Sequence, residues 1–545
     1  MFRKSSGQTS LFDIVNLFPT LLPLNDWSYI FNKLIFPLID EEKFKGFYET
    51  DNSKGGRPHK PIKTMISLLI FMAMEKLTWR EAEFQFSRRL DWLLATNTPL
   101  NEACIDHTTL YYFYSKLDED KKARELFREL TRKFAEACGT SLDKQRTDSF
   151  LIHGWLQILS RYGLFKETIR RFLQNLRKQK SGLYEEISQK LSREYLETEF
   201  DLTEKDHEKA QRQIKVMSND MYILYKAFEN HNQVKHYQSF KTLTNVFDQQ
   251  CETKKPKEPK EEKLEIEILD KPKGKEIISS PHNTEARYIK KGKQKVCGHK
   301  GFVTESCEET NEVQFITDVE LTPATKADSS ELPLIHARLE ESKMKPKKQY
   351  ADAGFVNGET ILESEGKEII LEGPSSGRSQ SFEVYESADR PLDVADFETK
   401  FENGEIEVVS CPQGQMPIDQ ARSEKTGKIN VHFDAETCSV CNKKDRCPVK
   451  IGKSIATLNM DEKAHAGAER HHKYMEDSNY RKECAIRAGA ESMVSEIVRG
   501  HGIRKSRHRS EFRTRLQLIF AAIACNTKRF IRYQGQCVQF SAIKA

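Results

Sequence analysis

The N-terminal part of the chain has apolar residues at helical spacing. Met65, Leu68 and Met72 follow one another three or four positions apart, which is typical of a helix with one buried face. The ten residues that end at Met74 are about half of the ~20 that a bilayer-spanning helix needs. The pattern predicts an all-α N-terminal domain over residues 1–140, with a buried helix and no membrane span.

Signals for helix starts in this region are compatible with a DNA-reading motif. The segment 55–61, rich in Gly and Pro, interrupts any helix, and Thr78 and Thr108 are candidate N-caps of short helices that follow. A helix-turn-helix would place its second helix near Thr108, where it could enter a major groove. A plain helical bundle fits the same residues about as well, because this motif is weakly specified by sequence.

Residues 180–280 are charged and favour helix. From Glu252 to Glu276 the chain has eight Lys, eight acidic residues and three Pro, a composition that cannot bury enough apolar surface to order itself. We therefore expect a charged helical insertion that ends in an exposed linker.

From about residue 298 the apolar period becomes two, which indicates strands. A strand, a helix and a second strand in succession indicate a parallel crossover and hence a mixed α/β sheet. Its parts would be residues 141–179 and 281–375. The expected elements are strands at 301–306, 313–319, 349–352 and 368–371 and a helix at 358–365.

The C-terminal third is expected to be a β-rich, cysteine-bearing insertion over 376–460 and a helical, basic region over 461–545. A long helix from Ala468 to Arg499 would pack one apolar stripe on the sheet. The stripe consists of Ile486, Ala490, Met493 and Ile497.

Charge changes this picture more than composition does. The whole chain carries only +5, but residues 481–533 hold thirteen Lys/Arg against four Glu, a net of +9. Such a concentration is expected where a protein meets a polyanion such as nucleic acid, although a solvated basic face with no partner is about as common. The N-terminus has no apolar stretch of signal-peptide type, so we expect a cytoplasmic protein with reduced cysteines.

Three acidic residues stand where such a fold could use them for chemistry. Asp148 precedes an apolar run, Asp352 ends a strand, and Glu491 lies one turn beyond Arg487 on the long helix. If the two strands are neighbours and the helix crosses them, the three carboxylates converge as ligands of two Mg²⁺ ions about 3.5–4 Å apart.

Each of these residues also has a plainer explanation. Asp148 could cap a turn, Asp352 could bind turn amides, and Glu491 could pair with Arg487 on an exposed helix face. Asp318 is a competitor for a metal position.

An ordered set of motifs carries a resemblance. The chain resembles the bacterial insertion-sequence DDE transposases, in the group with an N-terminal helical transposase domain and an internal cysteine cluster. The motifs are the N-terminal Gly-Arg-Pro segment, Gln145 to Ser149, Ser280-Pro281 with Glu285 to Arg287, Ile316 to Thr325, Asp352 to Val356, and Arg487, Glu491, Glu496 and Arg499.

The resemblance implies an RNase H-like catalytic core. It implies Asp148 and Asp352 as metal-binding and catalytic aspartates and Glu491 as the third carboxylate. Arg487 matches an arginine of the motif, and Arg499 stands near a DNA-contacting basic position. Further candidate DNA contacts are Arg57, Thr108, Arg504, Lys505, Arg507, Arg509, Arg513 and Arg515.

Four cysteines form a dense group, Cys411, Cys438, Cys441 and Cys447. Four thiolates can close a structural Zn²⁺ site, with His432 as a substitute ligand. Reduced thiols without metal are the alternative, because the spacing is looser than that of a zinc ribbon.

The expected function is Mg²⁺-dependent cleavage of DNA at transposon ends followed by strand transfer into target DNA. We expect a homodimer in the DNA complex, acting at the bacterial nucleoid. The alternatives are a catalytically inactive DNA-binding descendant of a transposase and a different RNase H-like nuclease.

Overall fold

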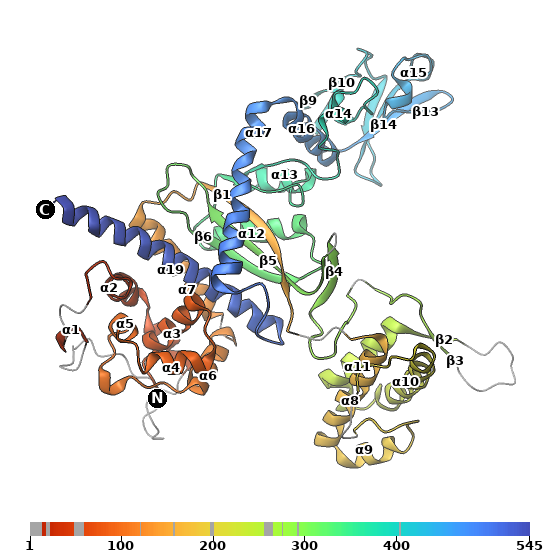
Figure 1. The fold of residues 1–545 in the computed structure, drawn as a ribbon. Coiled ribbons are helices and arrows are strands. Elements are labelled where there is room, and N and C mark those ends of the chain that lie inside the picture. The colour runs from red at the N-terminus through yellow and green to blue at the C-terminus, as the bar shows by residue number, and fades with distance from the viewer. Residues whose placement is uncertain are drawn as a thin grey trace.

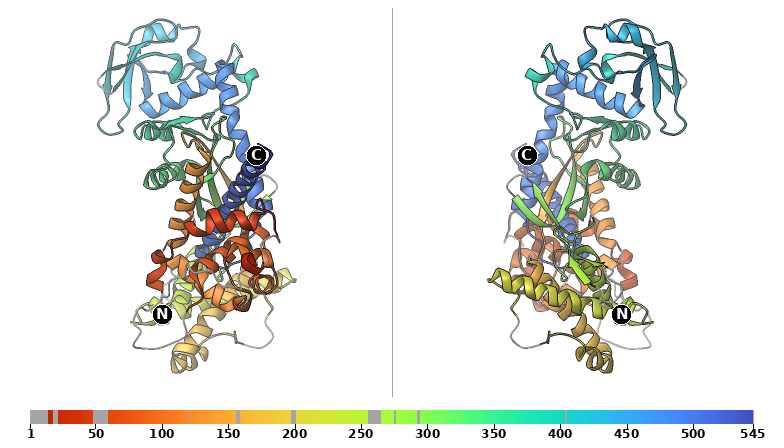
Figure 2. Two further views of the ribbon diagram at one scale, coloured as in Figure 1. Left: turned by 90° about the vertical axis from the view of Figure 1, so that its left-hand side faces the viewer. Right: turned by 90° about the vertical axis from the view of Figure 1, so that its right-hand side faces the viewer.

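The structure is a computed structural model of an elongated, mixed α/β chain (Figures 1 and 2). It describes residues 14–17, 22–47, 59–119, 121–155, 159–196, 201–254, 265–274, 276–291, 294–402 and 405–544. Within these ranges no helix is both long and apolar enough to cross a membrane.

The N-terminal region is helical in all its described parts. The predicted buried helix is α3, in which ten residues are buried. Thr78 caps the next helix through a capping box with Glu81, as expected. A helix does begin near Thr108, at His107, but the N-cap prediction for Thr108 was wrong, because Asp106 accepts the hydrogen bond of the Thr108 amide and so caps this helix. The α-helices are α1 (Ile14–Leu17), α2 (Trp27–Ile30), α3 (Ile62–Glu75), α4 (Trp79–Phe86), α5 (Leu90–Ala95), α6 (His107–Glu119) and α7 (Lys122–Cys138).

A six-stranded mixed sheet forms the centre of the molecule. Strands β4, β5, β1, β7 and β8 lie in that order, and β6 pairs with β5. β1 runs parallel to β7 and β7 parallel to β8, while the other pairs are antiparallel. The strands are β1 (Lys144–His153), β4 (Arg287–Lys291), β5 (Gln294–Ser306), β6 (Ile316–Pro323), β7 (Lys348–Tyr350) and β8 (Ile370–Glu372).

The crossovers of this sheet follow the predicted order. Helix α12 (Asp328–Glu341) joins β6 to β7, and α13 (Gly358–Glu365) joins β7 to β8. The predicted helix at 358–365 and the strands around it are therefore confirmed. One apolar core connects β1, β5 and β6 to the N-terminal helices and to the C-terminal helix α19 (Glu511–Lys544).

A separate helical group is inserted between β1 and β5 (Figure 1). Helix α8 buries its apolar face in the core of this group, so the group begins before the expected boundary at residue 180. The charged run from Glu252 to Glu276 was expected to be unstructured, but β2 at its start pairs with β3 further along it, and residues 255–264 between them lie outside the described residues. The elements are α8 (Arg161–Gln179), α9 (Ser181–Ser188), α10 (His207–Phe228), α11 (Gln238–Gln250), β2 (Cys251–Lys254) and β3 (Glu265–Ile268).

The cysteine-bearing module lies at the far end of the molecule from the N-terminal helices (Figure 1). It contains a two-stranded and a four-stranded sheet, both antiparallel. Its elements are α14 (Phe382–Tyr385), β9 (Glu398–Glu402), β10 (Glu405–Ser410), β11 (Asp419–Arg422), β12 (Ile429–Asp434), α15 (Ala435–Ser439), β13 (Lys450–Ile451) and β14 (Ile455–Met460).

The single long helix predicted from 468 to 499 is wrong in its continuity. The structure has α16 (Glu462–Glu476), α17 (Ser478–Cys484) and α18 (Gly489–Ser495), followed by a π-helical turn to Gly500. The break falls at Asp477, whose extended backbone and side chain cap α17. The predicted stripe is nevertheless buried at Ala490, Met493 and Ile497.

Candidate active site and cysteine centre

Asp148 and Asp352 come from neighbouring parallel strands. The register pairs Arg146 of β1 with Tyr350 of β7, and each aspartate lies two residues further along its chain. Asp148 is inside β1 and Asp352 lies two residues beyond the end of β7, so continuing the register places the two aspartates opposite each other along the chain. The sequence predicted that these two strands would be neighbours, but it did not predict their register.

The local bonds of the two aspartates are those of turns and strand ends. The Gly354 amide donates to Asp352 Oδ1 at 2.8 Å, and the Ser149 amide donates to Asp148 Oδ1 at 2.7 Å. A methyl group on Gly354 would lie 3.0 Å from Asp328 Oδ2 and 3.1 Å from Asp352 Oδ1. Asp328 therefore stands beside Asp352, and nothing in the sequence pattern had singled it out.

Glu491 is exposed on α18, which packs against β1. Neither Glu491 nor Arg487 has an ion pair within the described residues. The alternative interpretation, an ion pair of Glu491 with Arg487 on the helix surface, is therefore not observed. Asp148, Asp352 and Glu491 do not form a group of ligand atoms within 4.8 Å of one another in the described chain. Their convergence on metal ions stays a prediction.

Asp318, the expected competitor, is held by an arginine. Its carboxylate is buried and accepts from Arg338 Nη2 at 2.8 Å and from Arg338 Nε at 3.1 Å. Arg338 also bonds Glu331 at 2.9 Å. An aspartate bound this way already has its charge neutralised, so it is a poor metal ligand.

The basic segment after Arg499 lies along the end of β1. His153 forms a parallel bridge with Lys505, and Lys505 Nζ sits 5.1 Å from the centre of the Trp155 ring. Its candidate DNA contacts comprise five exposed residues and two half-buried ones, Arg513 and Arg515. Arg499, Arg504, Lys505, Arg507 and Arg509 are exposed.

Several of these cations also serve the fold. Arg507 donates to the carbonyl oxygens of Leu77 and Lys76 at 2.7 and 2.8 Å. Arg515 pairs with Glu320 and Glu511, and Arg513 lies over the ring of Tyr111. These three residues are therefore weaker candidates for phosphate contact than the sequence suggested.

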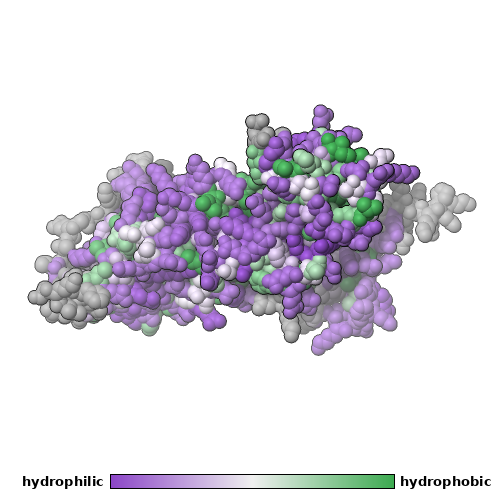
Figure 3. Space-filling view, turned by 90° about the horizontal axis from the view of Figure 1, so that it is seen from above, coloured by the Kyte–Doolittle hydropathy of each residue, from purple (hydrophilic) through white to green (hydrophobic). Residues whose placement is uncertain are grey.

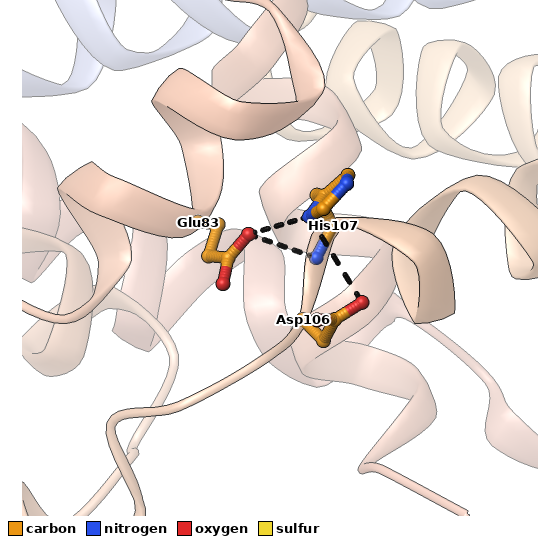
Figure 4. Close-up of side chains that lie close together, drawn as sticks. All are labelled: Glu83, Asp106 and His107. Atoms are coloured by element: carbon orange, nitrogen blue, oxygen red, sulfur yellow. Dashed lines mark hydrogen bonds and ion pairs between the residues drawn. The ribbon is translucent and has the colours of Figure 1, made fainter.

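Only one of the two N-terminal candidates for DNA contact is among the described residues. Arg57 lies outside the described residues, and Thr108 is exposed on the first turn of α6. Glu83, Asp106 and His107 gather at this turn (Figure 4), with His107 Nδ1 2.7 Å from Glu83 Oε2. Glu83 ties α4 to α6 and Asp106 caps α6, so both carboxylates serve the junction of the two helices.

The four predicted cysteines line one small cavity of about 40 Å³. The amides of Gln413 and Gln415 approach Cys411 Sγ at 3.4 Å, and the Lys443 amide approaches Cys441 Sγ at 3.4 Å. Amides that point at sulfur stabilise a thiolate better than a neutral thiol. Burial and the neighbouring thiols raise the pKa of Cys438, so the group resists ionisation unless a cation binds. His432 is bonded to Asp419 instead.

A second acid and histidine cluster was missed by sequence reasoning. Asp393, Asp396 and His472 bring ligand atoms within 4.8 Å of one another. Burial would raise the pKa of Asp393, but His472 and the charge of Arg378 lower it to about 2. Arg390 pairs with Asp396 at 2.6 Å. No spacing rule connects residues so far apart in the chain.

Two family models match the chain. Residues 21–116 match a transposase domain (DUF772), and residues 410–531 match a transposase DDE domain. A transposase domain near the N-terminus followed by a transposase DDE domain near the C-terminus supports an insertion-sequence DDE transposase. In this transposase the DDE match runs from the cysteine module through Glu491 into α19, whereas Asp148 and Asp352 lie outside it. The comparison with curated proteins gave no match, and the comparison with solved structures gave none.

Proposed function

We propose that the transposase cleaves DNA at the ends of its element and joins the freed ends to target DNA, with divalent metal held by Asp148, Asp352 and Glu491. Water would attack the scissile phosphate first, and the released 3′-hydroxyl would then attack the target. Mg²⁺ would neutralise charge on both the attacking and the leaving oxygen. No covalent protein intermediate is needed.

The observation that supports this proposal is the parallel register of β1 and β7, because Asp148 and Asp352 each follow the last registered pair, Arg146 and Tyr350, by two residues. The mixed sheet, in which β5 pairs antiparallel with β1, β4 and β6 while β1, β7 and β8 run parallel, fits the RNase H-like core that the family resemblance implies. Helix α18 packs on β1 and leaves Glu491 exposed, where a DNA phosphate can reach it. A homodimer that aligns two element ends belongs to the same proposal.

The test replaces each carboxylate by its amide. Asp148→Asn, Asp352→Asn and Glu491→Gln should each lower the rate of end cleavage by about 10³-fold, because each removes a charged metal ligand. DNA affinity, measured by gel shift, should remain close to that of the parent protein. Glu363→Gln, on an exposed glutamate of α13, is the matched control. Cleavage at the parental rate by any of the three variants would contradict the role of that residue.

We also propose that the cysteine cavity holds a structural zinc ion. Cys411, Cys438, Cys441 and Cys447 would supply four sulfur ligands, and the amides directed at Cys411 and Cys441 would stabilise their charge. The ion would close the module and would take no part in the reaction.

A further inference from the structure

The segment that carries Glu491 is bonded to the sheet by a group of charges centred on the buried Glu305. Arg146 lies on β1 two residues before Asp148, and therefore on the same face of the strand. Its Nη1 donates to the carbonyl oxygen of Ile486 at 3.0 Å. Its Nε and Nη2 donate to Glu305 Oε1 at 2.9 and 2.6 Å. Arg146 thus links the first aspartate's strand to the main chain that enters α18.

A second arginine holds the other end of the same segment. Arg529 of α19 donates from Nη1 to Glu305 Oε2 at 2.8 Å and from Nη2 to Glu496 Oε2 at 2.6 Å. Burial would raise the pKa of Glu496, but the hydrogen bond and charge of Arg529 lower it. One contact lies five residues before Glu491 and the other five residues after it.

Both arginines are anchored on one carboxylate. Glu305 of β5 is 1% exposed and uses one oxygen for Arg146 and the other for Arg529. Together with Glu496, the group contains two cations and two anions. The arrangement is therefore electrically neutral and adds no net charge beside the proposed metal ions.

Gly489 is the position where this arrangement meets the helix. Its φ of −63° is ordinary helical backbone, so no backbone strain requires glycine. A Cβ atom there would lie 1.8 Å from Arg146 Nη1 and 2.3 Å from Arg146 Cζ. A glycine inside a helix is less favourable than alanine, and the space it leaves is filled by the guanidinium.

We propose that Arg146, Glu305, Arg529 and Gly489 form an arginine clamp that sets the distance of Glu491 from Asp148. The four are positioning residues, since they act through α18 and touch none of the reacting atoms. The clamp rests on the proposed function, because it matters only if these carboxylates bind the metal ions. It explains how an exposed glutamate on a short helix is held in one place.

The experiment measures Mn²⁺ binding to the full-length protein by electron paramagnetic resonance, which needs no DNA and no turnover. Gly489→Ala and Arg146→Lys should each weaken Mn²⁺ binding about tenfold or more. Gly500→Ala is the matched control, because it adds the same methyl group to the same segment with its nearest neighbour, Glu496 Cγ, at 3.9 Å. Circular dichroism and thermal unfolding report whether the variants are folded.

A double-mutant cycle separates positioning from general damage. If Gly489 is needed only to admit Arg146, then Gly489→Ala should weaken Mn²⁺ binding no further in an Arg146→Ala background. Additive losses in the cycle would overturn the steric link between the two residues. Arg146→Lys, which keeps the charge opposite Glu305, should bind Mn²⁺ better than Arg146→Ala.

The same measurement distinguishes the clamp from the site on which it depends. If Asp352→Asn and Glu491→Gln weaken Mn²⁺ binding while folded Gly489→Ala and Arg146→Lys bind it like the parent, the clamp is wrong and the metal site stands. If the carboxylate variants bind Mn²⁺ like the parent, the proposed metal site fails, and the clamp fails with it.

Discussion

The central sheet and the cysteine module are stabilised in different ways. The core under the sheet joins more than fifty described apolar residues from the N-terminal helices, three strands and α19. The module has eleven buried apolar residues of its own cluster, and Met416 and Val440 are 73% and 85% exposed. Figure 3, seen from the end that carries the module, shows apolar patches on an otherwise mostly hydrophilic surface. A core this small usually needs a disulfide or a bound metal ion for stability. The zinc ion that we propose for the four cysteines would meet this need.

Charged groups show the same contrast. Under the sheet they are buried in bonded networks, such as Glu305 with two arginines and Arg338 with three acidic residues. The module has bonded charges as well, such as Arg390 with Asp396, but it adds a set of four thiols around a cavity. The sheet should therefore respond to loss of charge partners and to pH, and the module to loss of metal.

The largest expected effect is on the module. Cys438→Ser combined with Cys441→Ser should abolish zinc binding and unfold the module, because structural zinc contributes an apparent ~10–16 kcal/mol at neutral pH. The parent should contain about one zinc per chain by metal analysis, and the module's amides should lose protection from hydrogen exchange in the variant while those of β1 and β5 keep it. Cys104→Ser, at an exposed cysteine outside the module, is the control. Protein prepared without chelators and found free of zinc would contradict this staple.

The next effect concerns the buried charges of the sheet region. Arg338→Met should lower the free energy of unfolding by about 3–5 kcal/mol, because Asp318 and Glu331 are left buried without their cation. Urea denaturation followed by circular dichroism measures the change. The exposed pair of Arg132 with Glu136 gives the control, since Arg132→Met should cost under about 1 kcal/mol. Equal losses from both variants would remove the contrast between buried and surface pairs.

A third effect depends on pH. Burial lowers the pKa of His299, His336 and His501 to about 4, whereas unfolded histidine titrates near 6.5. The unfolded state therefore binds more protons below pH 6.5, and stability should fall as the pH drops from about 6.5 to 4. His299→Leu should remove up to about 3 kcal/mol of that loss. Thermal unfolding across this range measures it, and a pH dependence identical to the parent's would contradict the burial of His299.

The smallest effect concerns DNA affinity. Arg504→Ala with Lys505→Ala should reduce the slope of log affinity against log salt by about two, since each lost phosphate contact removes roughly 0.9. Lys450→Ala with Lys453→Ala, two exposed lysines of the module, is the matched control and should leave the slope unchanged. Arg507→Ala should act on stability more than on the slope, because its guanidinium already bonds Leu77 and Lys76. A slope lowered by the module pair alone would move the DNA path to the cysteine module.

Local patterns predicted much of the fold. The period of two predicted β5 and β6, and Thr78 as an N-cap predicted the start of α4, because these signals lie within a few neighbouring residues. The prediction of one long helix was wrong at Asp477. The side chain of Asp477 caps a new helix there, although the helical apolar period continues on both sides. A capping residue inside a periodic pattern can end a helix or sit on its surface, and the pattern does not decide which.

The three candidate carboxylates could be proposed from the sequence, but the residues bonded around them could not. Asp148, Asp352 and Glu491 were found from strand ends and from the ordered motifs. Arg146 and Glu305 are 159 residues apart, and Glu305 and Arg529 are 224 apart. Such pairs leave no local trace, because each partner alone looks like an ordinary charged residue.

The strand pairing also fixes when the centre can form during synthesis. β1 is made early, but its antiparallel partner β5 follows only after the helical group, and α18 follows only after the cysteine module. The helical group and the module are contiguous in the chain, so each can fold as it leaves the ribosome. The central sheet forms later, because its strand pairs join segments that are far apart in the chain, and such long-range contacts form slowly. A nascent chain that ends before Glu491 therefore carries Asp148 and Asp352 without the third candidate carboxylate and without α19.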